Sequence, residues 1–306
     1  MLLGGTDLTL AVAQRLSDIG HPPAGVVYLQ QTFSISYSPT GVKNQRHADL
    51  AGWCRLRSIP HVEYNGPQSI TTLQNTIGAD FALAAGWYHL VSASTRALFP
   101  LGVAGIHHSL LPKLRGGAPL NWALLSNEAV AGTSIFLMSD GVDDGPLLGQ
   151  RSVPIGQRTK IGELVLAAQE AALGMLDEII PKLAAGTLKP KPQIGSPTYC
   201  LQRTPDDSRI DWSRSASEID RLVRASSQPY AGAWCTFGDQ RLVIWDAVPI
   251  SDAPKILGAP GQLFRLPSRG PCVVAGMGVV EIVSATDDAG VDQLPRLLAS
   301  GQRRLN

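Results

Sequence analysis

The chain has 306 residues, enough for one large domain or two ordinary ones with a sizeable core. Hydrophobic residues make up 44% and charged residues 17% of the sequence, which excludes a disordered chain. The 26 Lys and Arg residues against 25 Asp and Glu residues leave a net charge of +1, whereas dedicated nucleic-acid-binding proteins usually carry a clear basic excess.

The opening residues and the cysteines indicate the compartment. The segment MLLGGTDLTLAVAQRL has no basic region followed by a long apolar one, so we expect no signal peptide. No segment approaches the roughly 18 consecutive apolar residues of a membrane span. The 4 cysteines form no CxxC pair, which argues against zinc fingers and a disulfide scaffold and is typical of a reducing compartment. We therefore predict a soluble cytoplasmic protein without a membrane partner.

The first half of the chain alternates short apolar runs with helical patterns. Strands are expected over residues 2–3, 24–29, 60–64, 79–85, 102–107 and 133–138, with helices over 7–19 and 49–58. Strands that alternate with helices predict βαβ units and a Rossmann-like, mostly parallel sheet of the α/β class. Continuous apolar runs such as FALAA predict strands that are covered on both faces.

The first of these strands ends at a glycine-rich turn, Gly4, Gly5 and Thr6. Backbone N–H groups at such a strand-to-helix turn can hold an anion. The turn lacks the GxGxxG spacing of a dinucleotide site, so we favour a purely structural turn.

The second half changes character after a long helical pattern over residues 161–185. The segment KPKPQIGSP has the composition of a linker. A helix over residues 215–226 and short strands over 234–237, 241–245, 261–264, 272–275 and 279–283 then predict a small OB-type barrel. The predicted division is a catalytic α/β domain over 1–190, a linker over 191–203 and an OB-like domain over 204–306.

The segment from 105 to 150 carries the candidate chemistry. His107 and His108 close a buried strand, at the edge where open α/β sheets place ligands. Asp140 and Asp143 follow the next predicted strand. If the two strands are neighbours, a histidine and a carboxylate meet there in an acid–base arrangement. Taken singly, each residue also has an ordinary structural explanation, as a strand end or a turn.

Two other kinds of site are disfavoured by the spacing. The histidines and aspartates lack HxH or HExxH spacing, so we predict no metal. The segment around Ser109 has no GxSxG elbow, which argues against a serine hydrolase.

As a set, these motifs resemble a known family. The segment HHSLLPKLRGGAPLNWA, followed by GVDDGPLL, is similar to the pattern of the 10-formyltetrahydrofolate-dependent formyltransferases. Downstream, RTPDDS and PYAGAW resemble the carboxyl-terminal domain of that family. APLNW and RTPDDS look most like the sugar-nucleotide N-formyltransferases, such as the formyltransferase domain that acts on UDP-4-amino-4-deoxy-L-arabinose. The combination is specific for the superfamily and does not specify the formyl acceptor.

The resemblance implies transfer of a formyl group from 10-formyltetrahydrofolate, as co-substrate, to an amine through a tetrahedral oxyanion. It implies His107 as the histidine that donates to this oxyanion and Asp143 as the carboxylate that helps to move the amine proton. It assigns Trp87, His89, Leu90, Val91, Asp140 and Gly141 to the folate, and Ser109, Leu110, Leu111, Pro112, Arg115 and Gly116 to the acceptor.

One position departs from the family pattern. The family asparagine stands two residues before the histidine, where this chain has Gly105, so one side-chain donor is missing. His108 either compensates as a catalytic donor or faces away, because adjacent strand residues point to opposite faces.

We predict that the protein is an N-formyltransferase for a small biosynthetic amine, either an amino-sugar nucleotide or an ornithine-type amine. One alternative is a methionyl-tRNA formyltransferase, but a net charge of +1 gives little attraction for a polyanion, so we expect no tRNA partner. The other is a folate-binding relative with weakened or altered catalysis, which Gly105 favours. The sequence does not indicate the oligomeric state.

Overall fold

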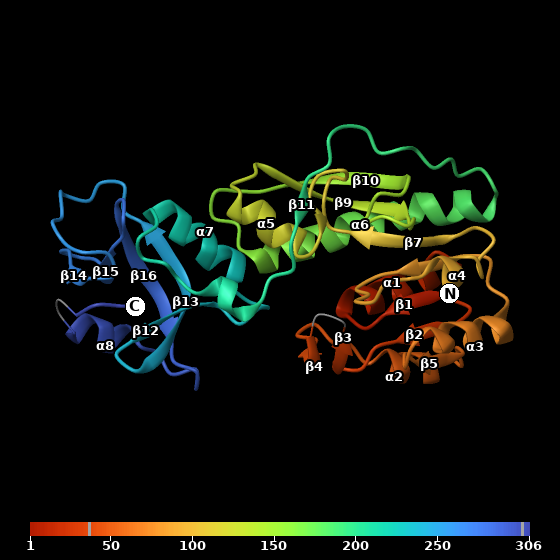
Figure 1. Cartoon of the computed structure of the whole chain (residues 1–306), viewed down its shortest axis with the longest axis horizontal. Coiled ribbons are helices and arrows are strands. Elements are labelled where there is room, and N and C mark those ends of the chain that lie inside the picture. The colour runs from red at the N-terminus through yellow and green to blue at the C-terminus, as the bar shows by residue number, and fades with distance from the viewer. Residues whose placement is uncertain (36–37, 301–302) are drawn as a thin grey trace. The chain divides into compact units, whose positions relative to one another are not determined.

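The computed structural model describes residues 1–35, 38–300 and 303–306. The chain divides into two compact units (Figure 1), which are described separately. The first contains residues 1–119, 130–154 and 166–200, and the second contains residues 120–129, 155–165 and 201–306.

The first unit is built on a seven-stranded sheet with the order β10-β9-β7-β6-β1-β2-β5. Neighbouring strands from β5 to β7 pair in parallel, whereas β9 and β10 are antiparallel additions. The predicted mostly parallel α/β sheet is confirmed. The strands are β1 (Leu2–Gly4), β2 (Val26–Tyr28), β5 (His61–Glu63), β6 (Ala82–Ala84), β7 (Val103–His107), β9 (Val130–Leu137) and β10 (Leu147–Pro154).

Helices cover both faces of this sheet, because the strands carry apolar side chains on both sides. Leu2 packs with residues of α1 (Asp7–Asp18), α2 (Leu50–Arg55) and α6 (Ile161–Ala184). Its neighbour Leu3 packs on the other face, with residues of α3 (Pro67–Ile77). The short helix α4 (Ala93–Arg96) precedes β7 in the chain. This alternation also decides which side of β7 each histidine faces.

The turn after β1 has a structural explanation in the fold. Thr6 caps α1, with its side chain accepting a hydrogen bond from the Thr9 backbone N–H. A Cβ atom on Gly4 would lie 2.1 Å from the carbonyl oxygen of Ala85, so only glycine fits this close approach.

Some elements of the first unit were not predicted. The strands β3 (Thr32–Ile35) and β4 (Ser38–Lys43) pair with each other, and β8 (Arg115–Gly116) pairs with β11 (Tyr199–Cys200). Strand β10 was also missed, because its sequence LLGQRSVP contains glycine and charge instead of an apolar run and most of its residues are exposed or half-buried.

The second unit contains a curled antiparallel sheet with the order β12-β13-β16-β15-β14, which is the predicted small carboxyl-terminal domain. Its core combines the sheet with α7 (Ala216–Ser226), whose N-cap is Ser215. Its strands and other helices are β12 (Ala233–Phe237), β13 (Gln240–Pro249), β14 (Leu263–Arg265), β15 (Pro271–Val274), β16 (Val279–Thr286), α5 (Pro119–Leu125), η1 (Pro205–Ser208) and α8 (Leu294–Ala299). Within the described residues, no helix is both long and apolar enough to cross a membrane.

Candidate active site

The first unit brings His107 and Asp143 together. His107 is the last residue of β7, and Asp143 lies in the loop between β9 and β10. Strands β7 and β9 are neighbours, with His107 opposite Ser134. The His107 Nδ1 atom lies 3.4 Å from the Asp143 Oδ2 atom, and the Asp143 side chain is 24% exposed. A titratable pair therefore lies at the carboxyl end of β7.

The loop that follows β7 fixes this pair from both sides. The backbone N–H of Gly116 donates to Asp143 Oδ2 over 2.8 Å, and the carbonyl oxygen of Leu114 lies 2.7 Å from His107 Nε2. A carbonyl can only accept, so Nε2 carries a proton. Nδ1 then faces the carboxylate, where it can accept a proton or donate one. The geometry thus suits proton transfer on the Nδ1 side of the ring.

His108 faces the opposite side of β7. Its Nδ1 atom lies 3.1 Å from Thr133 Oγ1, and this hydroxyl donates its own proton to the carbonyl oxygen of Ala168 in α6. The hydroxyl must therefore accept from His108 Nδ1–H, which leaves Nε2 as a buried lone pair with no hydrogen-bond partner among the described residues. The structure does not bring His108 together with His107 and Asp143 as a third donor.

The buried position of His108 changes its proton affinity. Burial is the main cause that lowers the pKa of His108 from 6.5 to about 3, and the charges of His107 and Arg46 lower it further. Between these two pH values, the unfolded chain binds a proton that the folded chain excludes. The free energy of unfolding should therefore decrease as pH falls through this window, by up to about 1.4 kcal/mol per pH unit.

Urea unfolding of a His108→Asn variant at several pH values checks this expectation. Asparagine can still donate to Thr133 and does not titrate, so stability should fall less steeply with decreasing pH in the variant. The exposed His21→Asn variant is the control and should keep the native slope. Equal slopes in the native chain and the His108 variant would contradict the assignment.

Neighbouring side chains fill the space beside Gly105. Position 105 faces the same side of β7 as His107, two residues away. A Cβ atom there would lie 3.0 Å from Met138 Cε and 3.1 Å from Phe136 Cε1, which is tighter than ordinary contact. The side chain of an asparagine at this position would therefore meet Met138 and Phe136.

The predicted folate segment, residues 87–91, lies in an aromatic cluster. The ring centroids of Trp87 and His89 lie 4.7 and 4.5 Å from that of Tyr64, and the ring of Phe33 lies 5.6 Å from His89. Trp87 Nε1 and His89 Nε2 are buried without a hydrogen-bond partner among the described residues, and burial lowers the pKa of His89. Leu90 points outward and is 94% exposed.

Arg96 connects this segment to the loop between β9 and β10, residues 138–146, which we call the aspartate loop. Its guanidinium donates to the carbonyl oxygen of Val91 over 2.7 Å and pairs with the carboxylate of Asp140. Gly141 packs against the carboxylate of Asp144, so closely that a Cβ atom on residue 141 would lie 2.0 Å from Asp144 Oδ2. The two loops assigned to the folate are therefore adjacent.

The predicted acceptor residues differ in exposure. Ser109 and Leu111 are only 2% and 3% exposed, and the Ser109 hydroxyl donates to Lys113 O over 2.6 Å, so both shape the loop from within. Leu110 packs on Gly132 of β9. The remaining members, Pro112, Arg115 and Gly116, all contact residues 198–200, through a hydrogen bond from Thr198 N to Pro112 O, an Arg115 contact with Tyr199 and a strand pair at Gly116.

Several contacts at the site were not predicted. Gln193 and Arg96 both contact the aspartate loop, and Tyr64 and Phe33 complete the aromatic cluster. Gln193 lies in the Pro-rich segment that looked like a linker, and the other three lie in segments remote from the motif. Only the three-dimensional arrangement identifies them.

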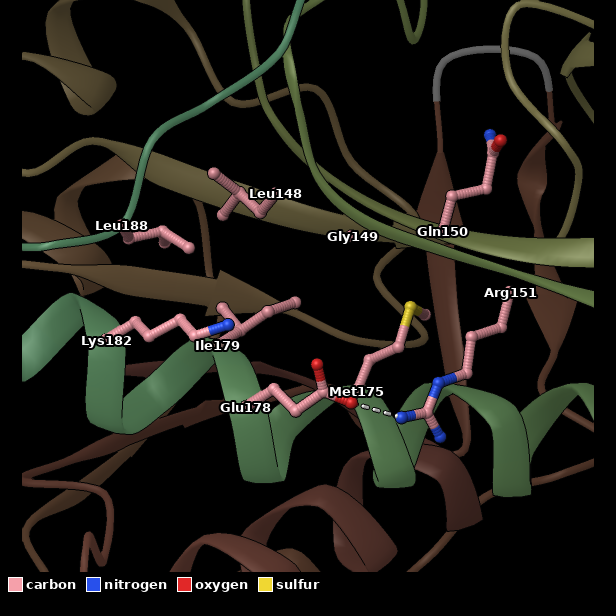
Figure 2. A pocket seen from close by; sticks show the side chains of 9 residues that line it. All are labelled: Leu148, Gly149, Gln150, Arg151, Met175, Glu178, Ile179, Lys182 and Leu188. Atoms are coloured by element: carbon pink, nitrogen blue, oxygen red, sulfur yellow. Dashed lines mark hydrogen bonds and ion pairs between the residues drawn. The ribbon is translucent and has the colours of Figure 1, made fainter.

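A pocket of about 140 Å³ lies elsewhere in this unit, between β10 and α6 (Figure 2). Arg151 points toward α6 and pairs with Glu178, whereas Gln150 points the other way and donates to Leu111 O and Ser134 Oγ. Neither His107 nor Asp143 lines this pocket.

Among the described residues, no group of three or more His, Cys, Asp or Glu side chains could hold a metal ion.

The chain matches two family models. Residues 50–179 match the model of the formyl transferases, and residues 203–295 match the model of the formyl transferase C-terminal domain. Together these segments cover well over half of the chain.

Solved structures share the fold at low sequence identity. HypX from Aquifex aeolicus, in complex with tetrahydrofolic acid, is 16% identical with a TM-score of 0.66, over 94% of this chain and 44% of HypX. The chain thus spans less than half the length of HypX. WlaRD, a sugar 3N-formyl transferase solved with dTDP and 5-N-formyl-THF, is 14% identical with a TM-score of 0.66, over 94% of this chain and 96% of WlaRD.

A third structure broadens the acceptor classes represented. Methionyl-tRNA formyltransferase from Clostridium thermocellum is 16% identical with a TM-score of 0.56, over 82% of this chain and 93% of that protein. The two family models and the motifs agree across both units. The chain belongs to the formyltransferase family.

Proposed function

We propose that the protein transfers the formyl group of 10-formyltetrahydrofolate to an amine of a small biosynthetic substrate, either an amino-sugar nucleotide or an ornithine-type amine. The observation that carries this proposal is the His107–Asp143 pair, held between Leu114 and Gly116 at the end of β7. The reaction forms a bond between the acceptor nitrogen and the formyl carbon, breaks the bond from that carbon to N10, and moves a proton from the acceptor nitrogen to N10.

In this proposal His107 and Asp143 handle the proton and the developing negative charge. Nε2 is engaged by the carbonyl oxygen of Leu114, so the Nδ1 side of His107 takes part. The 3.4 Å separation from Asp143 is longer than a good hydrogen bond, so this nitrogen is the less firmly held of the two. When Nδ1 takes the proton that the acceptor nitrogen releases, the Asp143 carboxylate stabilises the imidazolium that forms. Its Nδ1–H can then donate to the formyl oxyanion before the proton passes to N10.

The aromatic cluster fits a folate. A pteridine is a flat heteroaromatic ring that offers both a stacking surface and polar edges. Trp87 and His89 provide aromatic faces and two buried ring nitrogens that have no partner within the described part of the chain. Each such nitrogen is costly to bury unless a ligand satisfies it. Arg96 keeps Val91 and Asp140 together on the same ligand.

The charge balance favours a small acceptor over tRNA. Phosphate contacts supply much of the affinity for a polyanion, and a net charge of +1 provides little of that attraction. The likeness to a sugar 3N-formyl transferase over nearly the whole of both chains is in keeping with a nucleotide-linked amine. Gly105 keeps one alternative open, a folate-binding relative with altered catalysis, because the side chain of the family asparagine is absent.

Folate binding tests the donor half of the proposal. Calorimetry with 5-formyltetrahydrofolate, a stable analogue of the donor, should show saturable binding. Trp87→Phe keeps the aromatic face and loses the Nε1–H donor, so affinity should fall roughly 2- to 10-fold, as expected for one hydrogen bond.

Trp53→Phe is the matched control for this measurement. Trp53 also has a buried Nε1 atom that finds no partner in the described ranges, but it packs on the other face of the sheet, so this variant should bind as the native chain does. If millimolar ligand gives neither heat nor thermal stabilisation of the native chain, the donor assignment is wrong.

A further inference from the structure

The segment of residues 191–200, which we call the strap, is hydrogen-bonded on both sides of the His107–Asp143 pair. It contacts the loop that follows β7 and the end of the loop between β9 and β10. At one end, Lys191 exchanges two backbone hydrogen bonds with Leu147, of 2.8 and 2.7 Å. At the other end, the hydroxyl of Thr198 accepts from Leu114 N over 2.8 Å, and β11 pairs with β8. A segment with the composition of a linker therefore contacts the elements on both sides of the pair.

Gln193 is the residue of the strap that contacts the aspartate loop. Its Nε2 atom donates to the carbonyl oxygens of Asp143 and Gly145 over 2.7 and 2.8 Å. Its Oε1 atom accepts from Arg115 Nη2 over 2.7 Å and from Arg115 Nε over 3.2 Å. An amide has two N–H donors and two lone pairs, so all four are used and the orientation of the amide is fixed.

These contacts act on the backbone that aims the Asp143 carboxylate. Asp143 has a φ of 47°, in the left-handed region that residues other than glycine rarely adopt. Its carbonyl oxygen is held by Gln193, and its carboxylate by the N–H of Gly116. The same amide accepts a hydrogen bond from the side chain of Arg115, the residue before Gly116. Gln193 thus contacts Asp143 directly and, on the other side of the Gly116–Asp143 hydrogen bond, the residue that precedes Gly116.

We propose that Gln193 is a positioning residue for formyl transfer, which holds the Asp143 turn and Arg115 so that the carboxylate stays directed at His107. This inference rests on the proposed function, and it assigns no contact between Gln193 and the reacting atoms. A positioning error of about 1 Å can cost up to about 100-fold in rate, so loss of this amide should act on kcat more than on KM.

Gln193→Glu tests the donor half of the amide without changing its size. An ionised glutamate still accepts from Arg115 but points oxygen at two carbonyl oxygens, whereas a protonated glutamate regains one donor. We expect kcat at pH 8 to fall about 10- to 100-fold, with KM for 10-formyltetrahydrofolate changed less than about 3-fold. The ordinary pKa of glutamate is about 4.3 and the neighbouring Arg115 favours the ionised form, so the loss of kcat should be similar at pH 8 and pH 6.

Gln193→Met separates this effect from a general loss of packing. Methionine has nearly the same length and no amide, so its kcat should also fall about 10-fold or more, with a ratio to the native enzyme that does not change with pH. A kcat within about 2-fold of the native value in either folded variant would overturn the proposal. If Gln193→Glu does not fold, the methionine variant alone provides this test. A change in KM with an unchanged kcat would also overturn the proposal.

Gln74 in α3 provides the matched control. Its amide makes the same kind of bridge, with Nε2 donating to Ala79 O and Leu98 O over 2.7 and 3.1 Å. These carbonyls precede β6 and β7, at the amino ends of the strands, whereas His107 lies at the carboxyl end of β7. Gln74→Glu should lower the melting temperature and leave kcat and its pH dependence unchanged. Loss of kcat in this variant equal to that in Gln193→Glu would overturn a specific role for Gln193. A native enzyme that binds 5-formyltetrahydrofolate but formylates no amine would instead contradict the proposed function.

Discussion

Replacing His107 by glutamine or Asp143 by asparagine should lower kcat for formyl transfer about 10²–10³-fold. Glutamine can keep the hydrogen bond from Nε2 to the carbonyl oxygen of Leu114, so it removes only the Nδ1 side of the ring. Asparagine can still accept from the N–H of Gly116 and tolerates the left-handed backbone of Asp143, so it removes only the charge. Steady-state kinetics and thermal unfolding of both variants, alongside His107→Ala, measure the two effects.

The pair should also behave as a unit. The variant with both substitutions should be about as slow as the slower single variant, because groups that act on one proton are not additive. His108→Asn is the control and should turn over normally, since His108 bonds Thr133 on the opposite face of β7. Near-normal kcat in either His107→Gln or Asp143→Asn would mean that the catalytic assignment is wrong.

Restoring the family asparagine at position 105 should lower activity. The new side chain would have its Cβ atom 3.0 Å from Met138 Cε and 3.1 Å from a Phe136 ring that is only 3% exposed. Overpacking of this kind costs about 1–3 kcal/mol of stability. The strain falls on β7 and β9, which position His107, so we expect Gly105→Asn to reduce kcat about 10-fold or more and to lower the midpoint of urea unfolding.

A second substitution identifies the cause. Met138→Ala removes the flexible neighbour, so Gly105→Asn combined with Met138→Ala should recover part of the lost stability relative to Gly105→Asn alone. Activity should recover with it if the clash is responsible. A clear rise in kcat for Gly105→Asn with an unchanged KM would instead indicate a weakened family site that lacks only its asparagine.

The sequence was sufficient for the parts of the fold that depend on local pattern. Buried parallel strands followed from apolar runs such as the one that ends at Ala85, and the curled second sheet followed from closely spaced short strands. Strand β10 was missed because an exposed edge strand needs no apolar run, and it owes its place to pairing with β9. Strands β3 and β4 were missed as well, because among the described strands they pair only with each other.

The contact between His107 and Asp143 in the candidate site was predictable, because both residues lie at or after strand ends. His107 and Asp143 follow adjacent strands, so their meeting is a matter of topology. The direction of His108 follows from strand alternation, which left both possibilities open until its partner Thr133 was known. Gln193 was not predictable, because nothing in a Pro-rich segment indicates that its amide reaches the Asp143 turn.

The central claim is that this formyltransferase serves a small amine, and a direct comparison of acceptors tests it. The native chain and the His107→Gln variant would be given 10-formyltetrahydrofolate with a nucleotide-linked amino sugar, N-hydroxyornithine or charged initiator tRNA at about physiological salt. Release of tetrahydrofolate and the mass of the product would be followed. The account predicts a formylated small amine with the native chain, a large loss in the variant, and little formylated tRNA. Efficient formylation of the tRNA, or no formylation of any small amine by a chain that binds the folate, would contradict it.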